Sequence, residues 1–543
     1  MDIVLLALGL IALAAATGVC GRFVSFIPLP LLQIAFGAAL GLTDLQGLQV
    51  KFEPEVFLLL FVPPLLFADG WRLPKREAFH LRRQILLHAF LLVLVNVLLI
   101  GYFIHWLRPD IPLWAAFALG SVLSPTDAVA VSAIASRVKV PRTLLHILQG
   151  EALLNDASGL VALKFSLLAS IGAFTLGGAA VNVLLVSAAG AGIGFLLAYA
   201  YGRIRTWLAE PDGSTTIPLV LYLVLLPFGA YFAAEALHVS GILAAAAAGI
   251  TMSYADPKHD DNAALRLQAG NFFSLFAYLL NGIIFLLLGL QLPHVIRDGV
   301  QTAATSGHTA QHLLMLVVMV TGLILLIRLA WGWGLSRLGR LSIAARVAGK
   351  KNAPMPGGRV LLAHTVAGIR GAVTLAAAIS LPLQIVGGKS FPARDELILV
   401  AAGVIVLTLT IASVCLPMVL RGLPADDEKA VEQERAQAAV KASRAAIQAL
   451  GNDAGLEPAG DGERSGVVQV ITDEYKQRID AERQGATSAP DPNHDHHLNK
   501  QARLVGLRAE REELHRLHTS GDINDETLRT LMKPLDLAEE SLR

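Results

Sequence analysis

The stretch Ala116–Val131, AFALGSVLSPTDAVAV, is an apolar run interrupted near its end by a proline and a carboxylate. Pro125 has no backbone N–H, and its ring disrupts a helix at that point. Ser124–Asp127 is therefore predicted to break a membrane helix within the bilayer. Non-helical backbone at that depth is tolerated only inside the protein or around a wet cavity. For this segment alone, a proline kink in an inert helix is the alternative.

A second apolar stretch, Ala363–Pro382 (AHTVAGIRGAVTLAAAISLP), has a similar weakness, because two glycines flank Arg370. Two interrupted helices in separate halves of a chain are the best sequence pointer to the central binding site of a transporter. The ends of such half-helices carry partial charges. Asp127 and Arg370 have the signs needed to compensate helix ends of opposite polarity.

The composition indicates a membrane protein. Of the 543 residues, 54% are hydrophobic and 16% are charged, and the mean hydropathy is +0.57. Soluble domains carry about 25% charged residues, so an ordinary soluble enzyme is disfavoured. The net charge of +1 gives no electrostatic footprint for nucleic acid. Two cysteines, both in apolar runs, offer neither a disulfide framework nor a CxxC motif, and no cofactor or resident metal is predicted.

The charged residues divide the chain into two domains. From Pro424 to Arg543, 40 of the 120 residues are Asp, Glu, Lys or Arg, whereas the first 423 residues hold the other 47. We therefore expect a transmembrane domain over 1–423 and a polar, largely helical cytoplasmic tail over 424–543. Tail helices are expected at Asp426–Leu450, Leu498–Leu517 and Asp525–Leu542, and loops at Gly455–Gly466 and Gln484–Asn493.

Thirteen membrane spans are predicted, since a helix needs about 20 apolar residues to cross the bilayer. The first apolar run lacks a basic leader and is read as a retained span rather than a signal peptide. The spans are placed near 2–20, 28–44, 54–69, 84–107, 112–135, 143–172, 177–203, 216–234, 237–254, 270–292, 312–336, 360–385 and 396–420.

The distribution of positive charge predicts the orientation. Loops after odd-numbered spans hold 19 Lys and Arg residues, and loops after even-numbered spans hold 5. Loops rich in Lys and Arg lie in the cytoplasm. The N-terminus is therefore expected outside and the tail inside, which an odd number of spans also requires.

Seven charged residues lie in or at the ends of the predicted spans. Insertion of one such group at a helix centre costs roughly 2.5–3.5 kcal/mol, so together they must be paired or face water. An intramembrane ionisable residue is a functional-site hypothesis by default, with a structural ion pair as the alternative. The seven residues are Asp127, Glu151, Asp156, Lys164, Glu235, Arg328 and Arg370, and Asp69 lies near the cytoplasmic end of the third span.

The sixth span carries the segment Gly150–Asp156, GEALLND. Glu151 and Asn155 are four residues apart and share a helix face, whereas Asp156 is turned away from them. One face can make a structural contact while the next offers a carboxylate to a cavity. Hard monovalent cations prefer oxygen ligands, which Asp156, Asp127, Thr126 and backbone carbonyls near Pro125 could supply. Desolvation disfavours a charged carboxylate, so a buried acid can alternate between a proton and a cation.

Six segments together resemble the sodium/proton antiporters of the first monovalent cation:proton antiporter family, and the similarity spans roughly residues 1–423. The closest likeness is to the bacterial form with a cytoplasmic tail. The segments are LLFVPPLLFADGW (59–71), SVLSPTDAVAV (121–131), LQGEALLNDASGLV (148–161), EALHVSGILAAAAAG (235–249), LLNGIIFLLLGLQLP (279–293) and AHTVAGIRGAVTLA (363–376).

This resemblance implies inverted repeats with two crossing broken helices, an elevator-type movement and a homodimer in the cell membrane. It implies that Asp156 of the Asn155–Asp156 pair binds the cation or the proton, with Thr126 and Asp127 beside it. It further implies that Glu151 pairs with the arginine of the eleventh span, taken as Arg328. Arg370 would be the arginine of the second broken helix, and Asp69 the acid at the cytoplasmic entrance.

One residue departs from the pattern of the family. Some relatives have a serine that contributes a cation ligand where this chain has Ala152, so the preference among cations stays open. Asn155 rather than aspartate at the first position of the pair resembles the electroneutral members. A single carboxylate that holds one proton or one cation gives 1:1 exchange without net charge movement.

The leading hypothesis is a secondary antiporter that exchanges Na⁺ or Li⁺ for H⁺ and controls internal pH and sodium. The nearest alternative keeps the fold and transports K⁺ or a broad range of cations. A channel or a membrane sensor that signals through its tail belongs to another class, but the sequence contains neither a filter-like repeat nor a kinase or cyclase motif. An intramembrane enzyme is disfavoured because no HExxH or GxSxG motif is present.

Overall fold

In the computed structural model the described part of the chain is all helical, apart from connecting turns and one isolated β-bridge between Gln384 and Ser390. The predicted all-α fold is thereby confirmed, while the number of membrane crossings and the inverted repeats stay predictions. The described residues are 2–24, 27–43, 54–135, 140–171, 176–208, 216–254, 263–305, 309–341, 358–385, 390–421, 428–452, 461–483 and 497–542.

The helices of the membrane domain follow the predicted spans. They are α1 (Asp2–Phe23), α2 (Leu29–Gly41), α3 (Pro54–Arg72), α4 (Lys75–His80), α5 (Arg82–Leu86), the π-helix η1 (Leu87–Leu92), α6 (Val93–Leu107), α7 (Leu113–Val122), α8 (Ala128–Ala135), α9 (Arg142–Leu168), η2 (Ala169–Ile171), α10 (Leu176–Leu208), α11 (Thr216–Ala236), α12 (Gly241–Tyr254), α13 (Ala263–Thr305), α14 (Ala310–Leu341), α16 (Gly358–Val366), α17 (Ala372–Ile379) and α18 (Arg394–Leu420).

Length and hydropathy alone qualify six helices of the described residues to cross a membrane, and four shorter helices are also apolar. Both predicted interruptions are present, because α7 is separated from α8 and α16 from α17 by non-helical residues. The predicted separation near residues 234–237 is present as the turn between α11 and α12.

Two local predictions differ from the structure. The predicted continuous span over 84–107 contains the π-helix Leu87–Leu92, a feature that apolar periodicity does not reveal. Of the loop predicted at Gly455–Gly466, residues 455–460 lie outside the described residues, and the prediction is wrong for residues 461–466, because α20 begins at Asp461. Charged side chains there favour a solvated helix as readily as a loop. The loop predicted at Gln484–Asn493 lies outside the described residues.

The membrane helices form two groups by the way they pack on one another. We call α5–α9, α14 and α16–α18, which pack around the two interrupted helices, the broken-helix bundle. We call α1–α3 and α10–α13, which pack mainly on one another, the long-helix layer. The two groups meet where α13 packs on α18, α3 on α17 and α12 on α9. The short helix α4 joins the layer to the bundle.

The long-helix layer depends on glycines where α2 crosses α13. A Cβ atom at Gly37 would overlap the backbone oxygen of Leu286, and one at Gly289 would overlap that of Ile34. Small residues let membrane helices approach closely, and close packing is a main source of their association in lipid.

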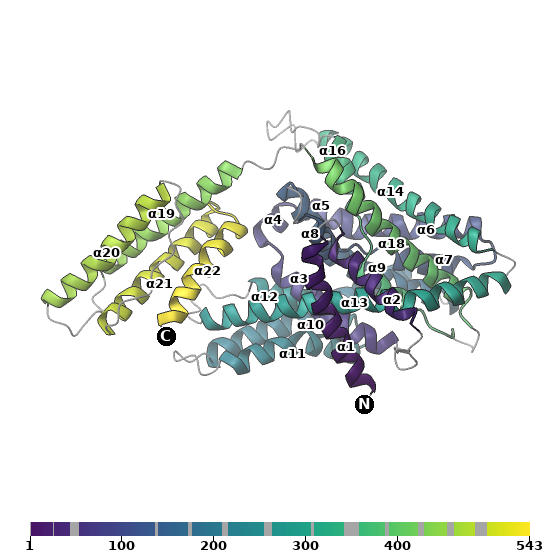
Figure 1. Cartoon of the computed structure of the whole chain (residues 1–543), viewed down its shortest axis with the longest axis horizontal. Coiled ribbons are helices and arrows are strands. Elements are labelled where there is room, and N and C mark those ends of the chain that lie inside the picture. Colours follow the sequence, from purple (N-terminus) through teal and green to yellow (C-terminus); the bar gives the residue numbers. More distant parts are fainter. Residues whose placement is uncertain are drawn as a thin grey trace.

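The tail forms helices of its own, namely α19 (Glu428–Asn452), α20 (Asp461–Arg483), α21 (His497–Ser520) and α22 (Asp525–Leu542). Its hydrophobic clusters are separate from that of the membrane domain, and one of them includes Leu514, Leu517 and Leu535. A buried ion pair joins Arg511 of α21 to Asp536 of α22 at 3.4 Å. The tail is therefore a folded unit that lies beside the membrane helices (Figure 1).

We predict that Gly37→Val destabilises the protein by roughly 1–3 kcal/mol, because the added side chain forces α2 away from α13. The matched control is Gly322→Val, since no atom lies within 4 Å of a Cβ at that position. Thermal unfolding of the detergent-solubilised protein tests this. An equal change of melting temperature in both variants would contradict the close approach of α2 and α13.

Candidate functional site

The first interruption is shaped by Asp127. After α7, residues Leu123–Asp127 leave the helical path at Pro125, and α8 begins at the next residue. Oδ1 of Asp127 accepts hydrogen bonds from the backbone N–H groups of Val129 at 2.8 Å and Ala130 at 2.9 Å. This is the geometry of a helix N-cap. Asp127 therefore stabilises the positive end of α8 within the membrane domain.

The second interruption lies against the first. The backbone N–H of Asp127 donates to the carbonyl of Ile369 at 2.9 Å. The hydroxyl of Thr374 lies 3.5 Å from the carbonyl of Pro125. A Cβ atom at Gly371 would overlap the Asp127 carboxylate, so only glycine fits there. The two interruptions that the sequence predicted are thus in direct contact.

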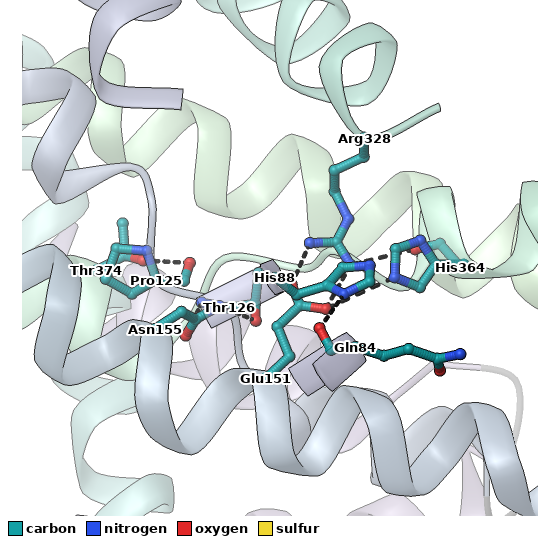
Figure 2. A network of polar contacts seen from close by, with 9 residues as sticks. All are labelled: Gln84, His88, Pro125, Thr126, Glu151, Asn155, Arg328, His364 and Thr374. Carbon is teal, nitrogen blue, oxygen red and sulfur yellow. Dashed lines mark hydrogen bonds and ion pairs between the residues drawn. The ribbon is translucent and has the colours of Figure 1, made fainter. Parts of the chain in front are cut away.

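Helix α9 is tied to the first interruption by Asn155 (Figure 2). Its Nδ2 donates to Oγ1 of Thr126 at 2.7 Å, and its Oδ1 accepts from the Thr126 backbone N–H at 3.3 Å. Both residues are buried. This two-way contact fixes the next residue of α9, Asp156, in register with the interruption.

Asp156 borders a small cavity of about 30 Å³ between the two interruptions. One water molecule needs at least about 10–15 Å³, so a water molecule or a dehydrated cation fits. Oδ1 of Asp156 and Oδ2 of Asp127 are buried and have no hydrogen-bond partner among the described residues. The residues that line the cavity are Leu65, Leu66, Asp69, Pro125, Thr126, Asp127, Ala128, Val129, Ala152, Asp156, Asn281, Gly371, Ala372, Val373 and Thr374.

The cavity combines residues from both helix groups. Asp69 comes from α3 and Asn281 from α13 of the long-helix layer, whereas Asp127 and Asp156 come from the broken-helix bundle. Asn281 is a polar residue in an otherwise apolar stretch of α13 and has two kinds of contact. Its Nδ2 donates to Ala277 O within its own helix at 2.8 Å, yet the side chain also borders the cavity.

Arg370 occupies the second interruption. Its side chain is fully buried, and its guanidinium nitrogens have no hydrogen-bond partner among the described residues. It lies near enough to Asp156 and Glu151 to interact with their charges. Its backbone N–H donates to Thr408 Oγ1 at 3.2 Å, which joins the interruption to α18.

Glu151 and Arg328 form a fully buried ion pair (Figure 2). The distance from Nη1 to Oε1 is 2.5 Å and that from Nη2 to Oε2 is 3.3 Å. Arg328 Nη2 also donates to the carbonyl of His364 at 3.3 Å. The pair therefore joins α9, α14 and α16, and a Cβ atom at Gly368 would overlap the guanidinium.

Two histidines complete this network, and the sequence interpretation did not single them out. His364 Nε2 lies 3.6 Å from Glu151 Oε2, and the rings of His88 and His364 are 4.9 Å apart between centroids. His88 Nδ1 contacts the carbonyl of Gln84 at 2.7 Å. The signal in the sequence was a histidine within each of two apolar runs.

One candidate ligand atom from each of His88, Glu151 and His364, a ring nitrogen or a carboxylate oxygen, lies within 4.8 Å of the other two. This spacing could hold a metal ion. However, both oxygens of Glu151 already contact Arg328. A divalent ion would lie beside a buried guanidinium with one carboxylate to balance them, which is electrostatically unfavourable. We therefore assign this network to the structure of the bundle.

Lys164 and Glu235 lie apart from the cavity. Lys164 Nζ is 3.2 Å from Glu235 Oε1, and the lysine side chain is 55% exposed. Glu235 Oε1 also accepts from the backbone N–H of Gly241 at the start of α12, at 3.2 Å. Glu235 therefore has a structural role, the alternative given for an intramembrane charge, and Lys164 pairs with it rather than with a carboxylate of the cavity.

Two interrupted helices in contact beside buried carboxylates, within an apolar all-helical domain, define a secondary transporter. Residues 9–422 match the family described as sodium/hydrogen exchanger, transmembrane. The chain belongs to this family of cation/proton antiporters, as its resemblance predicted, and not to a family of enzymes.

Similar proteins agree with this assignment. The chain is 39% identical to the uncharacterised Na⁺/H⁺ exchanger YjcE of Escherichia coli (strain K12), over 100% of this chain and 99% of that protein. It is 35% identical to the sodium, potassium, lithium and rubidium/H⁺ antiporter of Bacillus subtilis (strain 168), over 98% of this chain and 77% of that protein. The antiporter MjNhaP1 of Methanocaldococcus jannaschii shares the fold, with a TM-score of 0.57 and 17% identity over 78% of this chain and 99% of that one.

We predict that Glu151→Ala destabilises the protein by about 3–5 kcal/mol, because it leaves Arg328 buried without its partner. The control is Lys164→Ala, which removes an exposed pair worth about 0–1 kcal/mol. Thermal unfolding in detergent measures both, and the double variant Glu151→Leu/Arg328→Met should be more stable than Glu151→Ala. Equal melting temperatures for Glu151→Ala and Lys164→Ala would show that the buried pair is not a main support of α9.

Proposed function

We propose that this protein exchanges Na⁺ or Li⁺ for H⁺ by competition of the two ions at Asp156. The observation that carries the proposal is the unpartnered, buried carboxylate oxygen of Asp156 at the border of the cavity. Family membership supports antiport as the type of transport.

The arrangement of oxygen atoms supports cation binding at this place. Asp156, Asp127 and Thr126 all border the same cavity, and hard cations prefer carboxylate, hydroxyl and carbonyl oxygens. Asn155 is neutral and is held by Thr126, and one oxygen of Asp127 is used in capping α8. Asp156 is thus the carboxylate whose charge is freest to be balanced by either ion.

A carboxylate that holds one proton or one monovalent cation has the same net charge in both loaded states. This supports an electroneutral 1:1 exchange. Arg370 lies near Asp156, and its charge adds the same amount to both loaded states. In this mechanism Asp69 of α3 provides an acid on the entrance side of the cavity, and the exchange controls internal pH and sodium.

A broader cation range is the second candidate. The Bacillus subtilis relative, whose match covers 98% of this chain and 77% of the relative, is named for sodium, potassium, lithium and rubidium. Ala152 borders the cavity without an oxygen, so water or a backbone carbonyl would complete the coordination of the cation. Such a site would discriminate less sharply by ion size.

We further propose a homodimer within the cell membrane, with the N-terminus outside and the tail in the cytoplasm. Large apolar side chains are exposed along α10 and α11, among them Leu185, Phe195 and Leu221. Lipid and a second copy of the chain would cover such a surface. A channel would conduct current down a gradient, which distinguishes it from this antiporter.

We predict that Asp156→Asn abolishes cation-induced proton efflux from acid-loaded proteoliposomes, because an amide cannot exchange a proton for a cation. Asp298→Asn, at an exposed position of α13, should keep the wild-type rate. A pH-sensitive dye reports the efflux with Na⁺, Li⁺ and K⁺ in parallel, and a response to K⁺ selects the broader range. Exchange that survives in Asp156→Asn would refute the proposed site.

We further predict that exchange moves no net charge. A Na⁺ concentration jump on proteoliposomes adsorbed to a solid-supported membrane should give no current, while the dye in the same vesicles reports proton movement. Asp156→Asn vesicles supply the background for both signals. A current that grows with the rate of exchange would exclude the 1:1 electroneutral mechanism.

A further inference from the structure

The corner between α21 and α22 is hydrogen-bonded to the short helix α4. The guanidinium of Arg76 donates to the backbone carbonyls of Gly521 at 2.6 Å and Ile523 at 2.5 Å. The backbone N–H of Arg76 donates to Oδ2 of Asp525 at 2.7 Å. Residues more than 440 positions apart in the chain are therefore joined by three contacts at one point.

Helix α22 also reaches both helix groups of the membrane domain. Arg529 Nη1 donates to the carbonyl of Arg72 at the end of α3 at 2.8 Å, and α22 packs on α13. Glu526 pairs with Arg142 at the start of α9 at 3.1 Å. Because α3 and α13 belong to the long-helix layer and α9 to the broken-helix bundle, α22 bridges the two groups.

The contact is polar, and the tail remains folded on its own side of it. The hydrophobic clusters of the tail do not merge with that of the membrane domain. The corner is held to the tail by the backbone N–H of Asn524, which donates to Glu434 Oε1 at 2.8 Å, and by Asn524 Oδ1, which caps α22 at Thr527. The tail can therefore leave this face without unfolding.

Two carboxyl groups meet within the contact. Burial and a hydrogen bond with Asp525 raise the pKa of Glu77 from 4.5 to about 7. The pKa of Asp525 is lowered, through its hydrogen bonds with His518, Glu77 and the Arg76 backbone. The imidazole Nε2 of His518 lies 3.2 Å from Asp525 Oδ1 and forms an ion pair only when protonated. Further charged or titratable groups around the contact include Arg72 of α3, Lys75 and Arg76 of α4, Arg142 of α9, Tyr254 of α12, Glu434 of α19, and Glu526 and Arg529 of α22.

We propose that the α21–α22 corner acts as a clasp on the face formed by α3, α4 and α9, which restrains the exchanger in acid and releases it toward alkaline pH. The restraint rests on the proposed exchange function, whereas the docking itself does not. Alternating access requires one group of helices to move against the other. A helix tied to both groups favours one arrangement and slows the cycle.

The direction of the pH effect follows from proton linkage. In the docked state Glu77 keeps its proton up to a pH of about 7, whereas in the released state it loses the proton above its ordinary pKa of 4.5. Docking is therefore strongest below pH 4.5, and its equilibrium constant falls by up to about tenfold per pH unit until the pH passes 7. The lowered pKa of Asp525 favours docking at every pH above its ordinary value and does not oppose the trend.

The test uses the full-length protein in proteoliposomes and two readouts. Spin labels at His80→Cys of α4 and Lys533→Cys of α22, both exposed positions, report docking after Cys20→Ser and Cys415→Ser. We expect one short distance at pH 5.5 and a broad, longer distribution at pH 8. Arg76→Ala should give the broad distribution at both pH values, and Glu77→Gln, an amide that can still donate to Asp525, the short distance at both.

Exchange is compared between variant and wild type at the same pH, so that the titration of the ion site cancels. Arg76→Ala should raise exchange at pH 5.5 about threefold or more and leave it unchanged at pH 8. Glu77→Gln should lower it at pH 8. Arg83→Ala of α5 and Glu512→Gln of α21, at exposed positions, are the matched controls and should behave as wild type.

A distance distribution that does not change with pH would overturn the clasp as a pH-dependent contact. Distances that change as expected while Arg76→Ala exchanges at the wild-type rate would overturn its restraining role. If no variant exchanges any cation, the proposed function fails, whereas the clasp still stands or falls on the distances.

Discussion

The contact between the two helix interruptions is the constraint on which the rest of the membrane domain depends. In lipid every backbone polar group must be satisfied within the protein. The Asp127 N–H meets Ile369 O, and the Asp127 carboxylate satisfies the start of α8. Because each interruption completes the other, the chain can keep non-helical backbone beside buried acids, and the cavity exists only between them.

Asp127, Glu151 and Asp156, the acids beside the two interruptions, differ in how fully they are engaged. Glu151 is neutralised by Arg328, and its network joins three helices. Asp127 uses one oxygen for capping and leaves the other unpartnered. Among the described residues Asp156 borders the cavity with an unpartnered oxygen and caps no helix, while Asn155 holds its position through Thr126. Asn155, the residue directly before Asp156, is held rigidly. Such support keeps the shape of the site constant, so that its charge changes only with the bound ion.

The sequence predicted the elements whose cause is local. Pro125 and the glycines around Arg370 marked both interruptions, and the turn between α11 and α12 was found. The π-helix Leu87–Leu92 and the roles of His88, His364 and Asn281 were not found. Helices that are apolar all round give no signal of which face meets which neighbour. Whether a polar side chain in such a helix borders a cavity or packs on its own turn depends on helices far away in the sequence.

The tail docks through polar contacts, whereas the membrane helices pack through close contact of their backbones. Gly37 and Gly289 bring backbones together over a permanent contact, whereas α22 meets α3, α4 and α9 through hydrogen bonds and ion pairs that water can replace. Exposed ion pairs contribute little on their own, so such a contact stays near balance. When the docked and released states have similar free energies, the binding of a single proton can shift the equilibrium between them. In the proposed clasp this is the proton on Glu77, which lies beside Asp525 at the centre of the contact.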